Sequence, residues 1–414
     1  MRKESGSRWL AMAVIIMAGE AIFLLPFVMP RIFSSLMLDV FSMSKFEFGI
    51  LRSSYGVVAI FAYFLGGPLA DRFRPNRLMA VALCSTALAG FYLATIPDSN
   101  NFAWIYAYWG ASTIMLFWAV MMRCTRVIGG EQQGFAFGLL DGGRGLTSVL
   151  ISSVSVWILA DQLPEDMALA EVDDKAKAFS NVVLFVTCFV LAVSMLVWIA
   201  LRNIRTEVEE DGLDPGRVLS VLRIPAVWMQ AVMILLAYSC YRVTDNFTIL
   251  AEDVLGYDDV SSSWLGAMAL WGRPIAAISA GLIADRISTS KTMYYAFALL
   301  VLAGALIGFG PVEVYAETVV FIGVAATSIA VFALRGLYFA IMGEARIPIA
   351  VTGTAVGIAS LVGYLPDVYM LPYMGWLNDT FPGVQGHRYI FMSMMLFGLL
   401  GLGVTFLFRR RAVS

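Results

Sequence analysis

Charged residues are scarce in this chain. Aspartate, glutamate, lysine and arginine make up 14% of its 414 residues, whereas hydrophobic residues make up 60%. Soluble domains carry about a quarter charged residues, so the composition excludes a soluble globular fold. Many apolar runs reach the ~20 residues with which an α-helix crosses a bilayer. These runs are continuous rather than alternating, which argues against a transmembrane barrel. The sequence therefore predicts an all-α integral membrane protein.

Histidine and cysteine are nearly absent. His387 is the only histidine and falls in a predicted loop, and the four cysteines lie in or beside apolar runs without paired spacing. These counts give no support to a disulfide framework or a metal site, and no nucleophile–base grouping is visible. The formal net charge of −2 does not indicate nucleic-acid binding. We therefore expect neither an enzyme nor a cofactor, a metal ion or a nucleic-acid partner.

Twelve apolar segments are long enough to span the membrane. The expected spans are residues 9–36, 48–70, 78–96, 102–122, 134–160, 181–201, 227–250, 263–284, 292–310, 317–341, 349–374 and 389–408. A long acidic loop is expected over 161–180. The most polar internal stretch follows the sixth span, so we expect a six-helix bundle over residues 1–201, a linker over 202–225 and a second six-helix bundle over 226–414.

Two short patterns occur twice at nearly the same spacing. The tripeptide Ala-Asp-Arg at residues 70–72 recurs at 284–286, an offset of 214, and Gly-Glu at 130–131 recurs at 343–344, an offset of 213. Two landmarks at one spacing indicate a tandem repeat of two halves. Because each half holds six spans, both have the same orientation, related by an axis along the membrane normal.

Basic residues predict which side of the membrane the termini occupy. Roughly 18 lysines and arginines fall on the side of the termini, whereas four fall on the other side: Lys45, Lys175, Lys177 and Arg388. By the positive-inside rule, the termini, both Ala-Asp-Arg turns and the linker are cytoplasmic.

The repeated turn resembles the signature of the major facilitator superfamily. The first copy matches over residues 67–72 and departs at 74–76, where Arg-Pro-Asn replaces the usual Gly-Arg-Lys; the second copy keeps Gly, Ile, Ala, Asp and Arg within 281–286. The stretches MPRIF, ADR and VIGGEQQGFAFGLLDGGRG look most like the organophosphate and anion transporter branch. The resemblance implies a monomeric secondary transporter of the bacterial inner membrane, whose two pseudo-symmetric bundles rock about a central site.

The repeated turns predict a conformational latch. A carboxylate at a cytoplasmic helix end can accept backbone N–H groups from a neighbouring helix start and pair with arginines of the turn. Such contacts form only while the cytoplasmic helix ends are close, which the resemblance assigns to the outward-open state. The alternative is that these residues only flank a helix. The latch residues are Asp71, Arg72, Asp285 and Arg286.

Ionisable residues inside the expected spans call for a reason, since each costs ~3 kcal/mol in a bilayer. At ~1.5 Å per residue, Glu20, Arg144 and Arg273 lie closest to mid-membrane. Asp141 and Arg144 are three residues apart, so they share a helix face and can pair within the helix; the glycines around them favour close helix packing. Four others fall toward the outer end, where snorkelling could explain them: Arg31, Arg52, Asp245 and Asp367.

Arginines outnumber acids in the expected cavity. The resemblance implies that Glu20, Arg242 and Arg335 line the path, while Arg144 and Arg273 face it from flanking helices. Excess guanidinium charge suits a carboxylate, sulfonate or phosphate, which accepts two hydrogen bonds from one arginine. Aromatic residues could shape this pocket, although packing or an interfacial belt is the alternative for each. The expected substrate-binding residues are Arg144, Arg242, Arg273, Arg335, Trp118, Tyr238, Tyr241 and Tyr338.

Glu20 is the mid-membrane carboxylate on an expected cavity helix. Burial disfavours the charged form of a carboxyl group, so Glu20, together with Asp141, is a candidate for proton coupling. The alternative is that Glu20 permanently neutralises an arginine such as Arg144 or Arg273. Organophosphate transporters carry a basic residue on helix 1, where this chain has Glu20. That difference favours proton-linked movement of another small anion over phosphate exchange.

The sequence as a whole predicts a proton-coupled symporter for a small organic anion, such as a carboxylate, a sulfonate or a phosphorylated metabolite, working by alternating access. One rival is an efflux transporter for amphiphilic compounds, which would have an apolar cavity and tolerate loss of Arg242 or Arg273. A second rival is a membrane sensor without transport activity. A sensor usually has a soluble output domain, and the expected linker is too short to be one.

Overall fold

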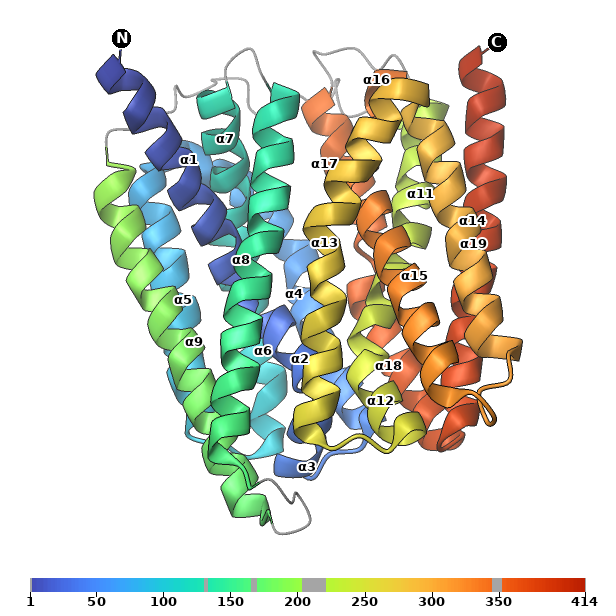
Figure 1. Cartoon of the computed structure of the whole chain (residues 1–414). Helices are drawn as coiled ribbons and strands as arrows, with labels where there is room; N and C mark the ends of the chain where they lie inside the picture. The colour runs from blue at the N-terminus through green and yellow to red at the C-terminus, as the bar shows by residue number, and fades with distance from the viewer. Residues whose placement is uncertain (1, 130–132, 165–169, 203–220, 345–351, 414) are drawn as a thin grey trace.

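The helices stand roughly parallel, and both chain termini lie at one end, at the top of Figure 1. We call this the terminal end and the opposite end the distal end. The computed structural model describes residues 2–129, 133–164, 170–202, 221–344 and 352–413, and within these ranges it contains helices and no strand. Most of the expected linker, residues 203–220, and Glu131 of the repeated pattern lie outside the described residues.

Each half of the chain supplies one bundle. The first contains α1 (Arg2–Phe23), η1 (Leu24–Val28), α2 (Met29–Ile32), α3 (Ser34–Val40), α4 (Lys45–Arg72), α5 (Pro75–Ala94), η2 (Ser99–Asn101), α6 (Phe102–Gly110), η3 (Ala111–Trp118), α7 (Ala119–Gly129), α8 (Gln133–Gln162) and α9 (Val172–Ala200). The second contains α11 (Pro225–Arg242), η5 (Val243–Asn246), α12 (Phe247–Leu255), α13 (Asp259–Ile287), α14 (Thr289–Phe309), α15 (Ala316–Leu337), α16 (Ile341–Glu344), α17 (Thr352–Gly363), α18 (Pro366–Thr380) and α19 (Val384–Val413).

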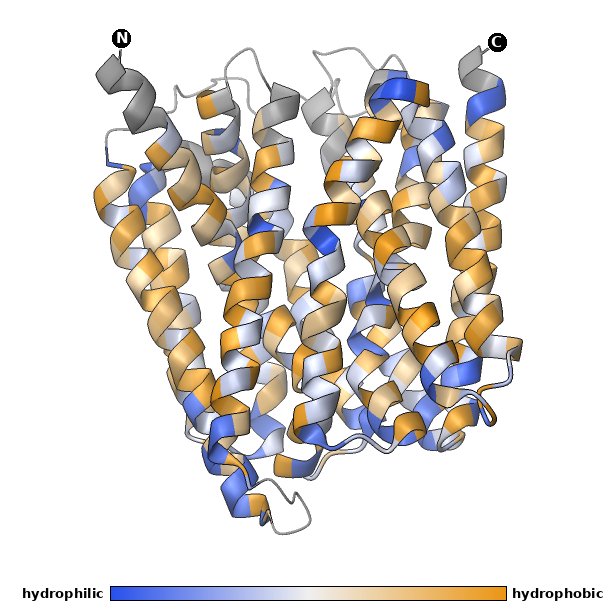
Figure 2. Ribbon diagram, in the orientation of Figure 1, coloured by the Kyte–Doolittle hydropathy of each residue, from blue (hydrophilic) through white to orange (hydrophobic). Residues whose placement is uncertain are grey.

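The expected all-α membrane architecture is confirmed. Ten helical runs within the described ranges are long and apolar enough to cross a membrane. Helix α4 and the broken pair α17–α18 complete the twelve spans. Figure 2 shows hydrophobic residues along the middle of the helices and hydrophilic residues gathered toward the distal end, as expected for a bilayer-spanning bundle.

The predictions of two loops from the sequence are wrong, because the structure has helix at both places. Helix α9 begins at Val172, so helix occupies much of the expected acidic loop at 161–180. Helix α19 begins at Val384, which places His387 in a helix rather than in a loop. In both places hydropathy marked the apolar core of the span, but the helix continues into polar residues. Acidic residues such as Asp173 are favourable in a first helical turn.

Four spans are irregular near mid-membrane. The first passes through the π-helix η1, which contains Pro26, and the fourth through the π-helix η3. The seventh passes through the 3₁₀ segment η5, and the eleventh breaks before Pro366, the first residue of α18. Proline removes a backbone donor, and π-helical turns are frequent at functional sites. Side chains from all four irregular spans line the cavity described below.

The two bundles pack tightly at the distal end. Helix α4 packs against α18, and α8 packs against α13. A Cβ atom added at Gly49 or Gly375 would collide with the backbone carbonyl of Leu371 or Lys45, respectively. Asp379 of α18 accepts the backbone N–H groups of Lys45 (3.2 Å) and Phe46 (2.7 Å). Glycine is therefore needed on both helices for the distal end to close.

We expect Gly375→Leu to hold the distal end open, because the new side chain has no space against the Lys45 carbonyl. The measurement is maleimide labelling of Ser34→Cys, a fully buried position beside Thr248 of the other bundle, with the four native cysteines replaced. Labelling should be at least about tenfold faster than in the Gly375 parent. Gly403→Leu is the control, because nothing lies within 4 Å of its added Cβ. Equal labelling of all three proteins would refute this reading of the contact.

Candidate functional site

A cavity of about 660 Å³, open solvent included, lies between the bundles. Ligand sites often lie between the helices of bundles, and residues of both bundles line this cavity. Its lining residues are Glu20, Phe23, Phe27, Val28, Arg31, Tyr55, Ala59, Tyr63, Ile114, Trp118, Arg144, Tyr238, Tyr241, Arg273, Arg335, Tyr364 and Asp367.

A central charge cluster consists of Glu20, Asp141, Arg144 and Arg273, and all of these except Asp141 line the cavity. Glu20 Oε2 lies 3.2 Å from Arg144 Nε, and Glu20 Oε1 accepts a hydrogen bond of 3.1 Å from Arg273 Nη1. Arg273 Nη2 donates to Asp141 Oδ1 at 3.3 Å. The expected pair between Asp141 and Arg144 is not found among these contacts. Arg144 instead turns toward α1, and Asp141 binds Arg273 of the other bundle.

Glycines bring the helices of this cluster together. A Cβ atom added at Gly19 of α1 would lie 3.2 Å from Arg144 Cδ, and one at Gly143 of α8 would lie 2.6 Å from Ile16 Cγ2. Gly145 faces the Arg273 side chain at 3.3 Å. Small residues permit close helix approach in membranes. Gly143 and Gly145 therefore belong to the expected packing surface on α8. The close approach of α1 and α8 at this surface lets Arg144 reach Glu20.

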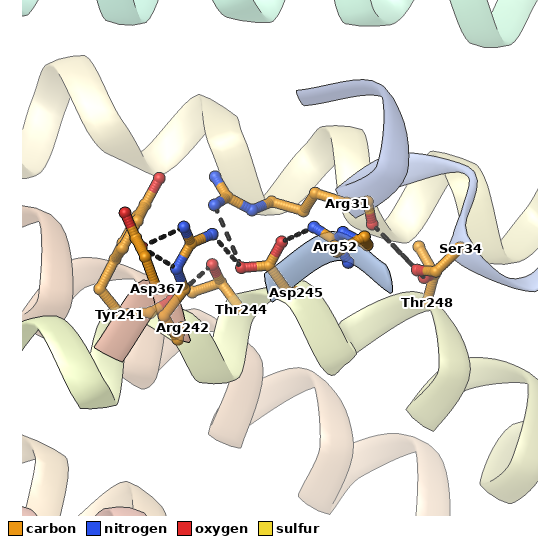
Figure 3. A network of polar contacts seen from close by, with 9 residues as sticks. All are labelled: Arg31, Ser34, Arg52, Tyr241, Arg242, Thr244, Asp245, Thr248 and Asp367. Carbon is orange, nitrogen blue, oxygen red and sulfur yellow. Dashed lines mark hydrogen bonds and ion pairs between the residues drawn. The ribbon is translucent and has the colours of Figure 1, made fainter. Parts of the chain in front are cut away.

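A second set of charges, the distal charge cluster, consists of Arg31, Arg52, Arg242, Asp245 and Asp367, of which Arg31 and Asp367 also line the cavity. In Figure 3 Asp245 is approached by Arg52, Arg31 and Arg242, with ion-pair distances of 2.9, 3.3 and 3.2 Å. Arg242 also donates to Asp367, through Nε at 2.8 Å and through Nη2. Arg31, Arg52 and Asp245 are at most 4% exposed. The snorkelling expected for these residues is therefore wrong, because buried carboxylates rather than interfacial water satisfy the arginines.

The repeat explains why oppositely charged residues meet in the distal charge cluster. Arg31 and Asp245 are 214 residues apart, and so are Ser34 and Thr248, whose hydroxyl oxygens lie 2.5 Å apart. Positions related by the repeat can touch only where they lie beside the pseudo-symmetry axis. The contact line between the bundles therefore runs through these two pairs (Figure 3).

Arg335 differs from the other arginines that line the cavity. Its guanidinium carbon lies 4.5 Å from the centre of the Tyr241 ring, a cation–π contact. Among the described residues, it makes no hydrogen bond or salt bridge, whereas Arg31, Arg144 and Arg273 each pair with a carboxylate. Arg335 therefore presents hydrogen-bond donors to the cavity.

Most of the expected binding residues line this cavity. Trp118, Tyr238 and Tyr241 are lining residues, and Tyr238 stacks edge-on with Tyr364 at 4.8 Å. Two expected residues do not line it. Arg242 lies behind Phe27 and Tyr238, over whose rings it sits at 4.8 and 5.3 Å. Tyr338 is buried, and its main-chain oxygen accepts a hydrogen bond of 2.9 Å from Gln230.

The expected latch residues lie at the terminal end. Of Asp71 and Arg72 only the helical backbone is described, and Asp285 and Arg286 are exposed in the last turn of α13. The start of α14 is instead capped by Glu344, which accepts the backbone N–H groups of Thr289 and Ser290. The second copy of the Gly-Glu pattern, at residues 343–344, thus supplies a helix cap that the sequence alone does not predict.

The sequence reasoning also missed a contact at the distal end. Lys45, Asp253 and His387 meet there with hydrogen-bond distances of 2.5 and 2.8 Å. The sequence alone marks Lys45 only as one of the few basic residues outside the terminal side. The available signal is that the chain has one histidine, His387, at the edge of an apolar span. Because the sequence places it in a loop, this signal does not indicate a buried contact.

Comparisons with known proteins give the family. The sequence profile of the Major Facilitator Superfamily matches residues 9–368. Inner membrane protein YqcE of Escherichia coli (strain K12) is 26% identical over 422 residues, covering 99% of this chain and 95% of that protein. Two solved structures share the fold. A bacterial homologue of the human lysosomal transporter Spinster, inward-facing and unoccupied, has a TM-score of 0.74 at 12% identity over 98% of both chains. A mutant of the nucleoside transporter NupG has a TM-score of 0.73 at 10% identity, covering 98% of this chain and 99% of that one. With its twelve spans and a cavity between two bundles, this chain is a membrane transporter that belongs to the Major Facilitator Superfamily.

Proposed function

We propose that this chain is a secondary active transporter that moves a small organic anion across the bacterial inner membrane by alternating access. The observation that carries the proposal is Arg335, which lines the cavity without a carboxylate partner in the described part of the chain. A guanidinium in a low-dielectric cavity binds carboxylate, sulfonate or phosphate through two parallel hydrogen bonds. The substrate's anionic group is therefore assigned to Arg335.

The charges around the cavity favour an anion as well. Arg144, Arg273 and Arg335 face Glu20 and Asp141 in and beside the central charge cluster, which leaves one positive charge in excess. In the distal charge cluster three arginines face two aspartates, with the same excess. A cavity with net positive charge attracts anions and repels cations. Its aromatic wall would pack against the body of the substrate.

We further propose that the structure represents the inward-facing state, with the termini in the cytoplasm. The residue boundaries proposed for the two bundles and the linker are those expected from the sequence: 1–201, 202–225 and 226–414. Each described salt bridge between the bundles lies at the level of the cavity or nearer the distal end. Asp285 and Arg286 are exposed, as a released latch would be. The Spinster homologue of similar fold is also inward-facing.

A thermal-shift screen of the purified protein tests the proposed substrate class. The panel contains carboxylates, sulfonates, phosphorylated metabolites and amphiphilic cations. An anion that binds at 100 times its Kd stabilises the folded protein by ~2.7 kcal/mol, which gives a measurable rise in Tm. Stabilisation by amphiphilic cations alone would contradict the anion site and support the efflux rival.

Coupling is proposed to involve Glu20, which bridges Arg144 of its own bundle and Arg273 of the other. Glu20→Gln should abolish accumulation driven by a pH gradient but preserve exchange of labelled for unlabelled substrate, because glutamine cannot carry a proton. Proteoliposomes with and without an imposed pH gradient provide the measurement. Unchanged pH-driven accumulation would rule out a coupling role and leave Glu20 as a structural partner of the two arginines.

A further inference from the structure

The only histidine of the chain lies in a buried polar cluster at the distal end, away from the cavity. His387 of α19 is fully buried. Its Nε2 lies 2.8 Å from Asp253 Oδ2 of α12, and its Nδ1 lies 2.8 Å from Asn246 Nδ2 of η5. Lys45 Nζ of α4 donates to the same Asp253 oxygen at 2.5 Å. Lys45 belongs to the first bundle and the others to the second, so this cluster joins the bundles.

The hydrogen bonds around His387 fit its neutral form. Asn378 Nδ2 donates to Asn246 Oδ1 at 2.8 Å, so the Asn246 amide presents its NH₂ group to the imidazole. His387 Nδ1 is then an acceptor, and the ring proton on Nε2 is donated to Asp253. The donors and acceptors from Asn378 through Asn246 and His387 to Asp253 form one directed chain, which fixes the tautomer.

Adding a proton to His387 disturbs this arrangement at both nitrogens. A proton on Nδ1 would point at the NH₂ group of Asn246, where two donors face each other. At Nε2, a cationic imidazole and the Lys45 ammonium would share one oxygen of Asp253, so the two positive charges repel. The repulsion at Nε2 weakens the contact of Lys45 with Asp253, which is a side-chain ion pair between α4 and α12.

The charged groups of the surrounding helices do not supply a substitute partner. Asp379 of α18 is occupied by the backbone N–H groups of Lys45 and Phe46. Arg388, next to the histidine on α19, binds Glu313 and the Gly310 carbonyl. Glu252, the neighbour of Asp253 on α12, makes no described salt bridge with Lys45 or His387. Asp253 is therefore the carboxylate for which both cations would compete.

We propose that His387 is a proton-binding site whose protonation releases Lys45 from Asp253 and opens the distal end. Histidine titrates between about pH 5 and 8, so acidity on the distal side favours the distal-open state. This inference concerns the contact between the bundles and does not depend on the identity of the substrate, on Arg335 or on Glu20.

One histidine per chain allows the protonation state to be measured directly. NMR of protein labelled with ¹⁵N-histidine reports the two ring nitrogens of His387 without overlap. At pH 8 we expect one protonated and one unprotonated nitrogen, with the proton on Nε2. Between pH 8 and 5 both nitrogens should become protonated in one step. A ring that stays neutral throughout this range would refute the proposal.

Spin-label distances measure whether protonation opens the distal end. Labels at Asp173→Cys and Val314→Cys, both exposed and one on each bundle, are introduced with the native cysteines replaced. Acidification from pH 8 to 5 should lengthen this distance with the midpoint seen by NMR. His387→Gln keeps an acceptor for Asn246 and a donor for Asp253, so it should fold and stay closed at both pH values.

Arg388→Gln is the matched control, because it removes a charge from the adjacent residue but leaves the histidine in place. It should open on acidification as the parent does. If His387→Gln opens with the parent's midpoint, or if the ring becomes protonated while the distance stays short, the proposal is wrong. Neither outcome bears on the anion site, since no substrate is present in these measurements.

Discussion

Replacing Arg335 with glutamine is expected to abolish substrate binding and transport. The variant removes the cavity guanidinium that has no carboxylate partner in the described residues. Loss of a buried charge-assisted contact costs about 2–5 kcal/mol, which corresponds to a roughly 30- to 4,000-fold weaker Kd. The folded protein should lose little stability, because no internal ion pair is broken. The measurement is the thermal shift produced by the best anion of the panel, followed by counterflow in proteoliposomes.

Two further variants make the Arg335 test specific. Arg335→Lys keeps the positive charge but not the bidentate fork, so it should recover only part of the affinity. Arg410→Gln removes an arginine that stacks on Phe406 near the end of α19, outside the cavity lining, and should leave binding unchanged. If Arg335→Gln transports the anion at the parent rate, the assignment of the anion to this guanidinium is wrong.

Asp245→Asn is expected to break the distal closure. Asp245 is the shared partner of Arg31, Arg52 and Arg242, and its loss raises the excess charge of the distal charge cluster from one to two. Removing one partner of a buried ion pair costs about 3–5 kcal/mol. The cost falls on the closed state, because these arginines are shielded from water there. Since a shift of ~5.5 kcal/mol reverses a two-state equilibrium from 1:99 to 99:1, a cost of this size changes the balance between the closed and the open state strongly.

Labelling of Ser34→Cys by maleimide reports the effect of Asp245→Asn, and we expect it to be at least about tenfold faster than in the Asp245 parent. Adding Arg31→Gln to the Asp245→Asn variant returns the excess charge to one and should slow labelling again, a coupling that a double-mutant cycle measures. Asp173→Asn, at an exposed position on α9, is the control. Equal labelling of Asp245→Asn and its parent would show that this cluster does not hold the bundles together.

The fold was predictable because long apolar runs and a repeat of 214 residues are local and countable features of the sequence. The same features placed Glu20, Arg144 and Arg273 at mid-membrane, and the structure brings these three together. Helix ends were less predictable. Hydropathy detects the apolar core of a span and not the polar turns beyond it, which is why α9 and α19 begin earlier than expected.

Side-chain pairing was not predictable from position along the helices. Asp141 and Arg144 share a helix face, yet each binds a residue of another helix, because Gly143 and Gly145 bring α1 and α13 close. Arg31 and Asp245 looked like separate interfacial charges, and only their place beside the pseudo-symmetry axis makes them partners. Such contacts depend on how the bundles meet.

Rocking of two rigid bundles about the cavity predicts opposite changes at the two ends. Spin labels at Arg77→Cys and Lys291→Cys mark the terminal end, and the pair at Asp173→Cys and Val314→Cys marks the distal end; all four positions are exposed. In Gly375→Leu, compared with its parent, the distal distance should lengthen and the terminal distance should shorten. If both distances lengthen together, or if the terminal distance stays fixed while the distal end opens, the bundles do not rock and alternating access about this cavity is contradicted.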